Sequence, residues 1–196
     1  MAHPANTTIR TERSFDELID DAISRNGFAV VPVGYGDASA PGGGDPAADH
    51  PWSYSVGLSA VGLPELVLLG LDPLAAHFAM CWVATEAMSG RPVAADQRLD
   101  VAGIGIKVVE VPEEWLLTDP SRMAAWFDHA RRHGRAVGLP RLRQVVWADA
   151  EGRFPDDPTI RPGVDQPQVV LRDDPVSVPH RSHRTARRAR RVGQVA

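Results

Sequence analysis

The stretch of sequence that decides the fold is residues 52–73, WSYSVGLSAVGLPELVLLGLDP. Apolar side chains alternate with serines and a glycine along residues 52–58, and strict alternation of this kind predicts a half-buried strand. Residues 66–71 form a continuous apolar run, which is typical of a strand buried on both faces. Asp72 and Pro73 supply an N-cap acid and a first-turn proline, which together predict a helix that runs to about Ser89.

Similar signals continue on both sides of this stretch. Upstream, Ser14 and Glu17 form a capping-box pattern that predicts a helix ending at Gly27, and the apolar residues 28–33 predict a strand. Downstream, residues 99–111 predict one long strand or two shorter ones. Residues 119–134 repeat the Asp-Pro helix start, and residues 142–147 predict a last strand.

These elements predict an α+β fold: an antiparallel or mixed sheet of about five strands with three main helices packed on it. Strands joined by short turns pair antiparallel, because parallel pairing needs a long crossover. A length of 196 residues suits one domain with extensions. We therefore predict a flexible N-terminal arm over residues 1–13, a single domain over residues 14–160, and a disordered, arginine-rich tail over residues 161–196.

Composition narrows the class of protein. Cys81 is the only cysteine, so a single chain can form neither an internal disulfide nor a cysteine-based zinc cluster. Residues 1–13 contain no apolar run typical of a secretory signal, and polar residues interrupt the most hydrophobic stretch, residues 66–88, so we expect a cytoplasmic protein without a membrane span. Coding bias towards Ala, Gly, Pro and Arg suggests a bacterial source.

The arginine-rich tail could bind nucleic acid through its charge. Six arginines fall within residues 181–191, whereas the formal net charge of the whole chain is −4. The acidic body would repel a polyanion, and no aromatic residues alternate with the arginines to stack on bases. We therefore expect no specific nucleic-acid binding.

Four patterns could hold a metal ion or a phosphate, and each has a simpler interpretation. His77 and Cys81 are one helical turn apart, but Cys81 falls in an apolar stripe with Leu74, Phe78, Thr85 and Met88, which indicates packing. His129 and His133 share a zinc-like spacing, but the neighbouring Arg131 and Arg132 indicate a solvated basic face that repels cations. The acids of residues 149–157 fit a turn. The glycines of residues 34–44 precede a strand instead of a helix, so they predict a linker. No metal site is expected.

Several short motifs together resemble a bacterial family catalogued as domain of unknown function 4262 (DUF4262), over roughly residues 14–158. They are GFAV at residues 27–30, YSVGL at 54–58, PEL at 64–66, GL at 70–71, QVVW at 144–147 and GRFP at 152–155. The sequence departs from the family pattern at Leu63, where a histidine often precedes Pro-Glu-Leu, and at Ala148, where a proline often stands. The resemblance implies a fold and boundaries but no activity.

The same motifs contain a set of polar and aromatic residues at or near strand ends, which could line one cleft. These candidate ligand-binding residues are Tyr54, Ser55, Glu65, Gln144, Trp147 and Asp149. An aromatic wall with a few convergent polar groups is typical of a small-molecule site. If the cleft exists, Glu65→Gln is expected to abolish binding while leaving stability nearly unchanged.

The function that follows is a non-catalytic module that binds a small ligand or a protein partner, because no nucleophile, acid–base or metal set has motif support. The alternative is a flavin-binding protein of split-barrel type, or an oxidoreductase, suggested by the order of elements around residues 52–73. FMN would then be the cofactor, and only Ser53, Ser55, Ser59 and Lys107 could bind its phosphate.

Overall fold

The computed structural model describes residues 13–34, 51–134, 138–161 and 168–171. Six strands form one mixed sheet in the order β1-β2-β3-β6-β5-β4. Neighbouring strands are antiparallel except for β3 and β6, which are parallel. The prediction of an α+β fold with an antiparallel or mixed sheet is confirmed. The strands are β1 (Ala29–Val33), β2 (Trp52–Val56), β3 (Glu65–Leu69), β4 (Leu99–Val101), β5 (Ile104–Val111) and β6 (Leu142–Trp147).

The sheet has one strand more than the approximate number predicted, because residues 99–111 form a hairpin. Ala102 and Gly103 join β4 to β5 with positive φ angles of 53° and 85°. Two successive residues with positive φ match the twist of a tight hairpin turn. The Gly103 amide also donates to Asp100 Oδ1 at 2.9 Å, which further favours the turn over a continuous strand.

The helices begin where their capping residues predict. In α1 (Phe15–Asn26) both hydrogen bonds of the Ser14–Glu17 capping box are present, and in α2 (Pro73–Met88) Asp72 accepts from the amides of Leu74 and Ala75. The predicted third helix is divided into a 3₁₀ turn, η2 (Pro120–Met123), and α4 (Ala124–Arg132). Two further short elements were not predicted, namely η1 (Leu58–Val61) and α3 (Glu114–Thr118).

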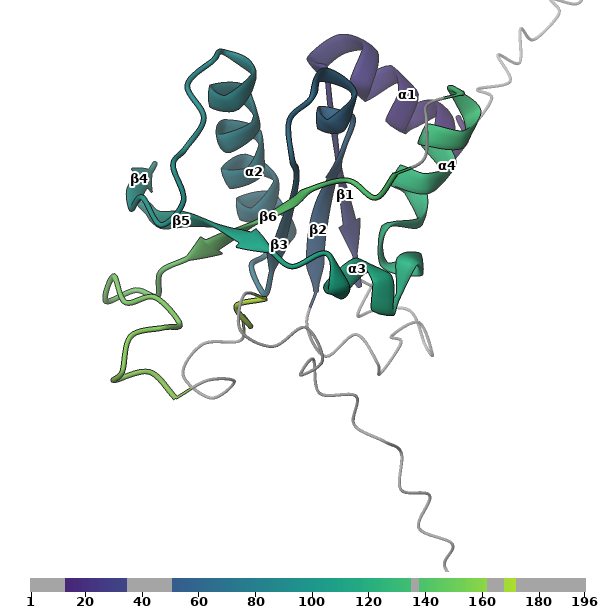
Figure 1. The fold of residues 1–196 in the computed structure, drawn as a ribbon. Coiled ribbons are helices and arrows are strands. Elements are labelled where there is room, and N and C mark those ends of the chain that lie inside the picture. Colours follow the sequence, from purple (N-terminus) through teal and green to yellow (C-terminus); the bar gives the residue numbers. More distant parts are fainter. Residues whose placement is uncertain (1–12, 35–50, 135–137, 162–167, 172–196) are drawn as a thin grey trace, which may run out of the picture.

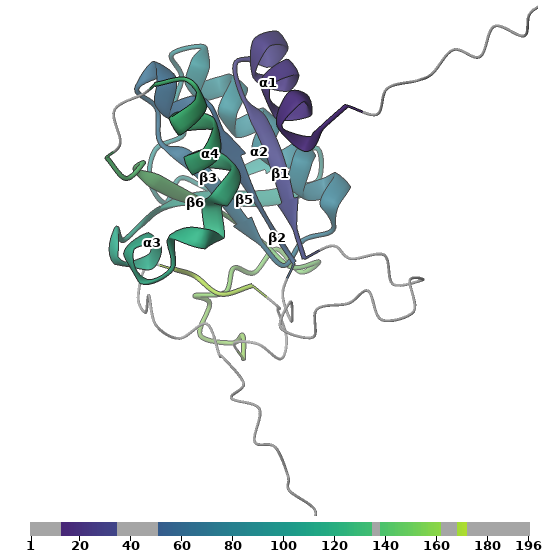
Figure 2. The same cartoon turned by 90° about the vertical axis from the view of Figure 1, so that its right-hand side faces the viewer.

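Helices cover both faces of the sheet and make three layers (Figures 1 and 2). On one face, α1, α3 and α4 pack on side chains of β1, β2 and β3, including Val31, Tyr54 and Val67. On the other face, α2 packs on Leu66, Leu68 and residues of β5 and β6. Within the described residues, no helix is long and apolar enough to cross a membrane.

The packing face of α2 differs from the predicted one. The predicted stripe is wrong, because Leu74, Phe78 and Met88 are 78%, 47% and 41% exposed. The buried side chains of α2 are instead Ala76, Ala79, Met80, Val83 and Ala84. Both faces of this helix are apolar, so periodicity alone does not select one. The small alanine side chains determine which face is buried, because they allow the helix to approach the sheet closely.

A segment beyond the predicted domain end returns to the sheet. Gln168 and Leu171 are 2% and 0% exposed, although the sequence placed the domain end at residue 160. The Leu171 amide donates to Gln144 Oε1 at 2.8 Å, and Gln144 Nε2 donates to the Val169 carbonyl at 2.6 Å. Residues 162–167 and 172–196 of the predicted tail, and residues 1–12 of the predicted arm, lie outside the described residues.

Candidate functional site

Glu65 is the centre of a buried hydrogen-bond network at the start of β3. Its side chain is 0% exposed. Oε1 accepts from the Gly57 amide (3.0 Å), the Ser59 amide (2.9 Å), Ser59 Oγ (2.7 Å) and Trp126 Nε1 (3.2 Å). Oε2 accepts from Ser55 Oγ at 2.5 Å. One carboxylate therefore joins β2, η1 and α4.

Gly57 makes the sharp turn that brings these donors together. Its φ is 117°, a conformation that side chains strongly disfavour. A Cβ atom at this position would also lie 3.0 Å from the carbonyl oxygen of Gly27. The chain can therefore leave β2 and direct the amides of Gly57 and Ser59 at Glu65 only with glycine here.

A cavity of about 290 Å³ lies beside this network. It is lined by the turn that carries η1, by the middle of α4, and by residues 138–141, which lead into β6. Its polar lining side chains are Ser59, Trp126, His129 and Arg141. Leu63, one of the two positions where the chain departs from the family pattern, also lines it.

His129 is the buried histidine in this wall. It is 5% exposed, so the prediction of a solvated face is wrong for His129, whereas His133 is exposed as predicted. The reason is that α1 packs beside α4 and places Asp20 Oδ1 2.9 Å from His129 Nδ1. The other ring nitrogen, Nε2, is buried and has no hydrogen-bond partner among the residues that the structure describes.

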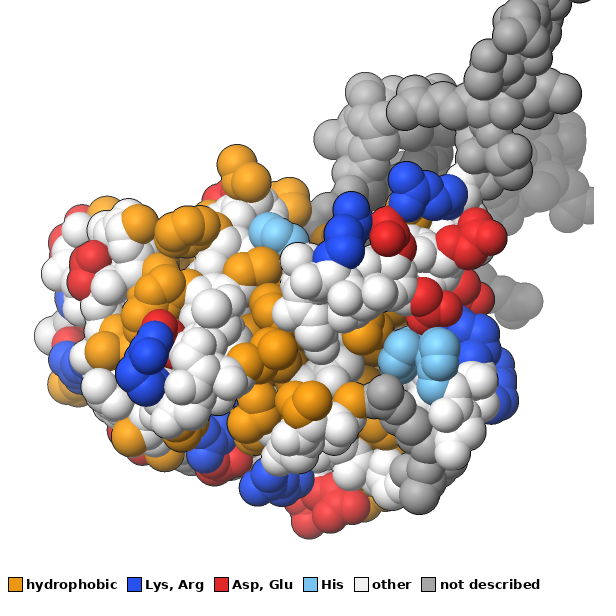
Figure 3. Space-filling view, turned by 90° about the horizontal axis from the view of Figure 1, so that it is seen from above, with side chains coloured by type: hydrophobic (Ala, Val, Ile, Leu, Met, Phe, Trp, Pro, Cys, Tyr) orange, Lys and Arg blue, Asp and Glu red, His pale blue; other side chains and the backbone are white. Residues whose placement is uncertain are grey.

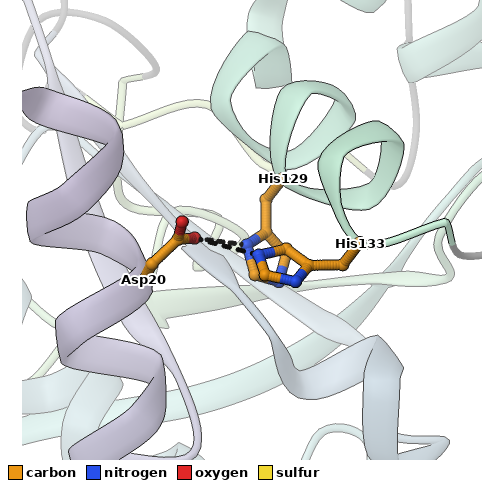
Figure 4. A group of neighbouring side chains, drawn as sticks. All are labelled: Asp20, His129 and His133. Carbon is orange, nitrogen blue, oxygen red and sulfur yellow. Dashed lines mark hydrogen bonds and ion pairs between the residues drawn. The ribbon is translucent and has the colours of Figure 1, made fainter.

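Asp20, His129 and His133 form a cluster between α1 and α4 (Figure 4). Asp20 Oδ1 also lies 3.4 Å from His133 Nε2 and accepts from Arg132 Nη2 at 3.0 Å. Burial raises the pKa of the Asp20 carboxyl, but the hydrogen bonds from His129, Arg132 and His133 outweigh it and hold that pKa below its usual value. Asp20 is therefore a carboxylate at neutral pH.

A larger, mostly apolar groove of about 540 Å³ runs between α1 and α2 beside β1. Figure 3 shows hydrophobic side chains gathered on this face of the molecule. Phe15 and Leu18 line the groove and are 57% and 49% exposed. Its polar groups include His77 and Cys81, whose Nε2 and Sγ atoms are 3.4 Å apart, and burial raises the pKa of the Cys81 thiol.

Three of the six predicted ligand-binding residues lie together near the smaller cavity. Ser55 and Glu65 are in direct contact, and the Tyr54 hydroxyl accepts from the Ala125 amide at 3.1 Å, one residue before Trp126 in α4. They form a layer behind the cavity wall, because Glu65 bonds to Ser59 and Trp126, which line it.

The other three predicted residues lie further along the sheet. Gln144 and Trp147 bond to residues 168–171, and the Trp147 amide donates to Gln168 Oε1 at 3.2 Å. Asp149 accepts from the amides of Glu151 and Arg153 in a turn, as its turn interpretation predicted. None of the six lines either cavity described above.

The side chains that do line the smaller cavity carried weak sequence signals. His129 was visible through its spacing from His133, but its acidic partner belongs to α1, more than a hundred residues earlier. Ser59, Trp126 and Arg141 belong to no sequence motif with a known chemical role. Only the folded chain brings them together.

The described residues form a three-layer α+β protein with a small, partly polar pocket between the turn that carries η1 and the middle of α4. A family model described as "Domain of unknown function (DUF4262)" matches residues 22–161, and the chain belongs to this family, which confirms the predicted resemblance. Comparison with curated proteins gives no match, and comparison with solved structures gives none.

Proposed function

We propose that this chain is a non-catalytic module that binds a small polar molecule in the 290 Å³ cavity. The observation that carries the proposal is His129 Nε2, a buried polar atom without a partner among the described residues, on a side chain of the cavity wall. Leaving such an atom unsatisfied costs about 1–3 kcal/mol. A ligand whose hydrogen-bonding group reached this atom from the cavity would recover that free energy.

The lining indicates the chemical class of the ligand. Arg141 is exposed at the rim, and among the described residues its guanidinium donates to the Gly62 carbonyl at 3.0 Å. A guanidinium has five N–H donors, so others remain for a carboxylate or phosphate. Ligand sites typically measure about 300–1,000 Å³, and this cavity is near the lower limit. We therefore expect a small anion with a hydroxyl or similar group for His129.

In this proposal Ser55 and Glu65 act from behind the wall. Glu65 fixes Ser59 and Trp126, and Ser55 fixes Glu65, so both determine the shape of the cavity. Sites are more selective when the side chains that line them are held by a second layer of hydrogen bonds.

The larger groove between α1 and α2 supports the proposal less well. Only two buried side-chain polar atoms among the described residues lack a partner, Trp115 Nε1 and His129 Nε2, and neither residue lines that groove. His77 and Cys81 within it contact each other.

The flavin alternative gains no support from the described part of the chain. Lys107 is 3% exposed and is paired with Asp156, while the hydroxyls of Ser55 and Ser59 bond to Glu65. Ser53 is 1% exposed. The groups that would hold the phosphate of FMN are therefore buried or already bound.

Titration of the full-length protein tests the proposal. Native mass spectrometry of the purified chain first reports any retained small molecule. NMR titration then uses glycolate, acetate and inorganic phosphate as probes, with amide shifts at residues 57–63 and 138–141 as the readout. We expect saturable shifts that are stronger for glycolate than for acetate and that weaken at least about tenfold in Arg141→Gln.

Arg131→Gln is the matched control, because Arg131 is 78% exposed on α4 and does not line the cavity. It is expected to bind the probes like the parent protein. Equal weakening in the two arginine variants would reveal a non-specific charge effect and overturn the proposal. No saturable shift with any probe, together with a bare mass, would also overturn it.

A further inference from the structure

We propose that Asp20, His129 and His133 form a binding site for a zinc ion between α1 and α4. This inference goes beyond the proposed function, since two members of the cluster, Asp20 and His133, do not line the ligand cavity. Figure 4 shows the Asp20 carboxylate in contact with both histidine rings, and the three ligand atoms all lie within 4.8 Å of one another.

Two of the three spacings between ligand atoms are close to those of a tetrahedral site, and the third is within 4.8 Å. Zinc binds nitrogen and oxygen at about 2.0–2.1 Å, which places two ligands of a tetrahedron about 3.3 Å apart. Asp20 Oδ1 is 3.4 Å from His133 Nε2 and 2.9 Å from His129 Nδ1. Shifts of a few tenths of an ångström in side chains would accommodate the ion at these two pairs.

The donor types favour zinc over a hard cation. Two imidazoles and one carboxylate form a ligand set that zinc uses, whereas calcium and magnesium prefer oxygen ligands alone. His129 lies in the last turn of α4 and His133 is its C-cap residue, four positions later, a spacing that places both rings on the same side of the helix end. Three protein ligands leave the fourth tetrahedral position open to water.

Local charge is also compatible with a cation. The sequence indicates repulsion from Arg131 and Arg132, but in the folded chain both are paired. Arg131 bonds to Asp128 at 2.6 Å, and Arg132 bonds to Asp16 at 2.8 Å as well as to Asp20. When an ion replaces the Arg132 hydrogen bond to Asp20, the guanidinium keeps Asp16 as its partner. The acidic face of α1 offsets the basic end of α4.

Zinc binding at Nδ1 of His129 would fix the protonation state of the other ring nitrogen, Nε2. A neutral imidazole that ligates a metal through Nδ1 carries its proton on Nε2 and can donate it to an acceptor. His129 would then offer the cavity a donor, which suits a carboxylate held by Arg141. This last step alone rests on the proposed function.

Isothermal titration of the full chain with zinc chloride, after removal of metal with a chelator, tests the site. We expect one ion per chain at the cluster and at least about a 100-fold weaker affinity in His133→Ala, the upper end of the loss seen even for outer partners of a metal. His133 has a side chain that is 46% exposed, so its removal should not unfold the protein. Asp20→Asn is expected to weaken binding similarly.

His77→Ala is the matched control. His77 is an exposed histidine on α2 that contacts Cys81 at 3.4 Å, and it is the other described histidine with a possible second ligand. Its removal is expected to change the zinc affinity less than about twofold. Zinc should also raise the melting temperature of the parent protein but not of His133→Ala, and cobalt should give the intense visible bands of tetrahedral coordination.

Equal zinc affinity in the parent protein and His133→Ala would overturn the proposal, as would loss of binding in His77→Ala alone. Melting curves of the metal-free variants show whether a loss of zinc binding is due to unfolding. If His133→Ala is unfolded, the zinc affinity of Asp20→Asn decides the outcome. Arg141→Gln separates the two proposals. It should weaken probe binding in the cavity at least about tenfold and leave zinc binding unchanged, so either proposal can fail without the other.

Discussion

A buried carboxylate without a nearby cation needs several donors, and Glu65 has five. The desolvation of a buried charge costs several kcal/mol. Each hydrogen bond to a charged group returns about 1.5–3 kcal/mol. The five donors, which are two backbone amides, two hydroxyls and an indole, satisfy the buried side chain of Glu65 and tie the wall of the cavity to the sheet.

The first prediction concerns Glu65→Gln. An amide replaces one carboxylate oxygen with an NH₂ donor, so at least one surrounding donor, such as Ser55 Oγ, loses its acceptor. We expect the free energy of unfolding to fall by about 1–3 kcal/mol in urea denaturation. This reverses the expectation from the sequence, which assumed an exposed ligand group.

Glu110→Gln is the control, because Glu110 has a 59% exposed side chain and an ordinary surface pair with Arg143. Glu110→Gln should change the free energy of unfolding by no more than about 0.5 kcal/mol. If Glu65→Gln were as stable as the parent protein yet bound no ligand, Glu65 would be a ligand-binding group and its assignment to the supporting layer would be wrong.

The environment of Glu65 could not be predicted from local sequence. Its position before a buried strand is visible in residues 64–69, but four of its five hydrogen bonds come from the tight turn at residues 57–59 and from Trp126, sixty-one residues later. The pairing of His129 with Asp20 spans 109 residues. Spacing patterns detect neighbours on one helix, whereas these contacts depend on how helices pack.

At the scale of elements, helix and strand starts were predictable because their causes are local. The capping box at Ser14, the Asp72-Pro73 start and the strands on both sides of residue 60 all appear where the sequence places them. The buried face of α2 could not be predicted, because this helix carries apolar side chains on all of its sides. Which face is buried depends on the fit of alanines against β3 and β5.

The second prediction follows from this orientation of α2. Met80→Ala should lower the free energy of unfolding by about 2–5 kcal/mol, because Met80 is 0% exposed and its removal leaves a cavity. Leu74→Ser should change it by no more than about 0.5 kcal/mol, since Leu74 is 78% exposed. Denaturant titration of the two variants compares the two faces of α2 directly. A larger loss of stability in Leu74→Ser than in Met80→Ala would contradict this packing.

At the scale of the whole molecule, Phe154 and residues 168–171 pack on a part of the sheet that lies beyond α1 and α4. Phe154 packs on Val109 and Val146, and Val170 packs against the same cluster. The sequence did not predict this packing, since the chain beyond about residue 160 is rich in proline, aspartate and arginine, a composition typical of disorder. The backbone groups of Val169 and Leu171 bond to Gln144, a buried amide that needs partners.

The third prediction compares two truncations. A chain ending at residue 160 loses Leu171 from the core and leaves both polar groups of Gln144 without partners, so its free energy of unfolding should fall by at least about 3 kcal/mol. A chain ending at residue 171 keeps all of these contacts and is the control. Equal melting temperatures for the two chains would show that the segment contributes nothing to stability.

The fourth prediction concerns pH and the pair formed by Lys107 and Asp156. Lys107 is the only lysine of the chain and is 3% exposed on β5, with its Nζ atom 5.1 Å from the centre of the Phe154 ring. Its hydrogen bond holds the pKa of the Asp156 carboxyl below the usual value, and this effect outweighs the opposing effect of burial. A carboxyl with a lowered folded-state pKa stabilises the fold above its unfolded pKa of about 3.9.

This contribution is fully present at neutral pH and is lost as the pH falls from about 4 through the folded pKa of Asp156. Asp156→Asn should therefore be less stable than the parent protein at pH 7, and the difference should narrow as acid protonates Asp156 in the parent. Glu114→Gln, a change at an exposed acid on α3, should leave the pH profile unchanged. Urea denaturation from pH 7 to pH 3 measures both profiles, and a difference that stays constant with pH would mean that the Asp156 charge does not hold Lys107 in the fold.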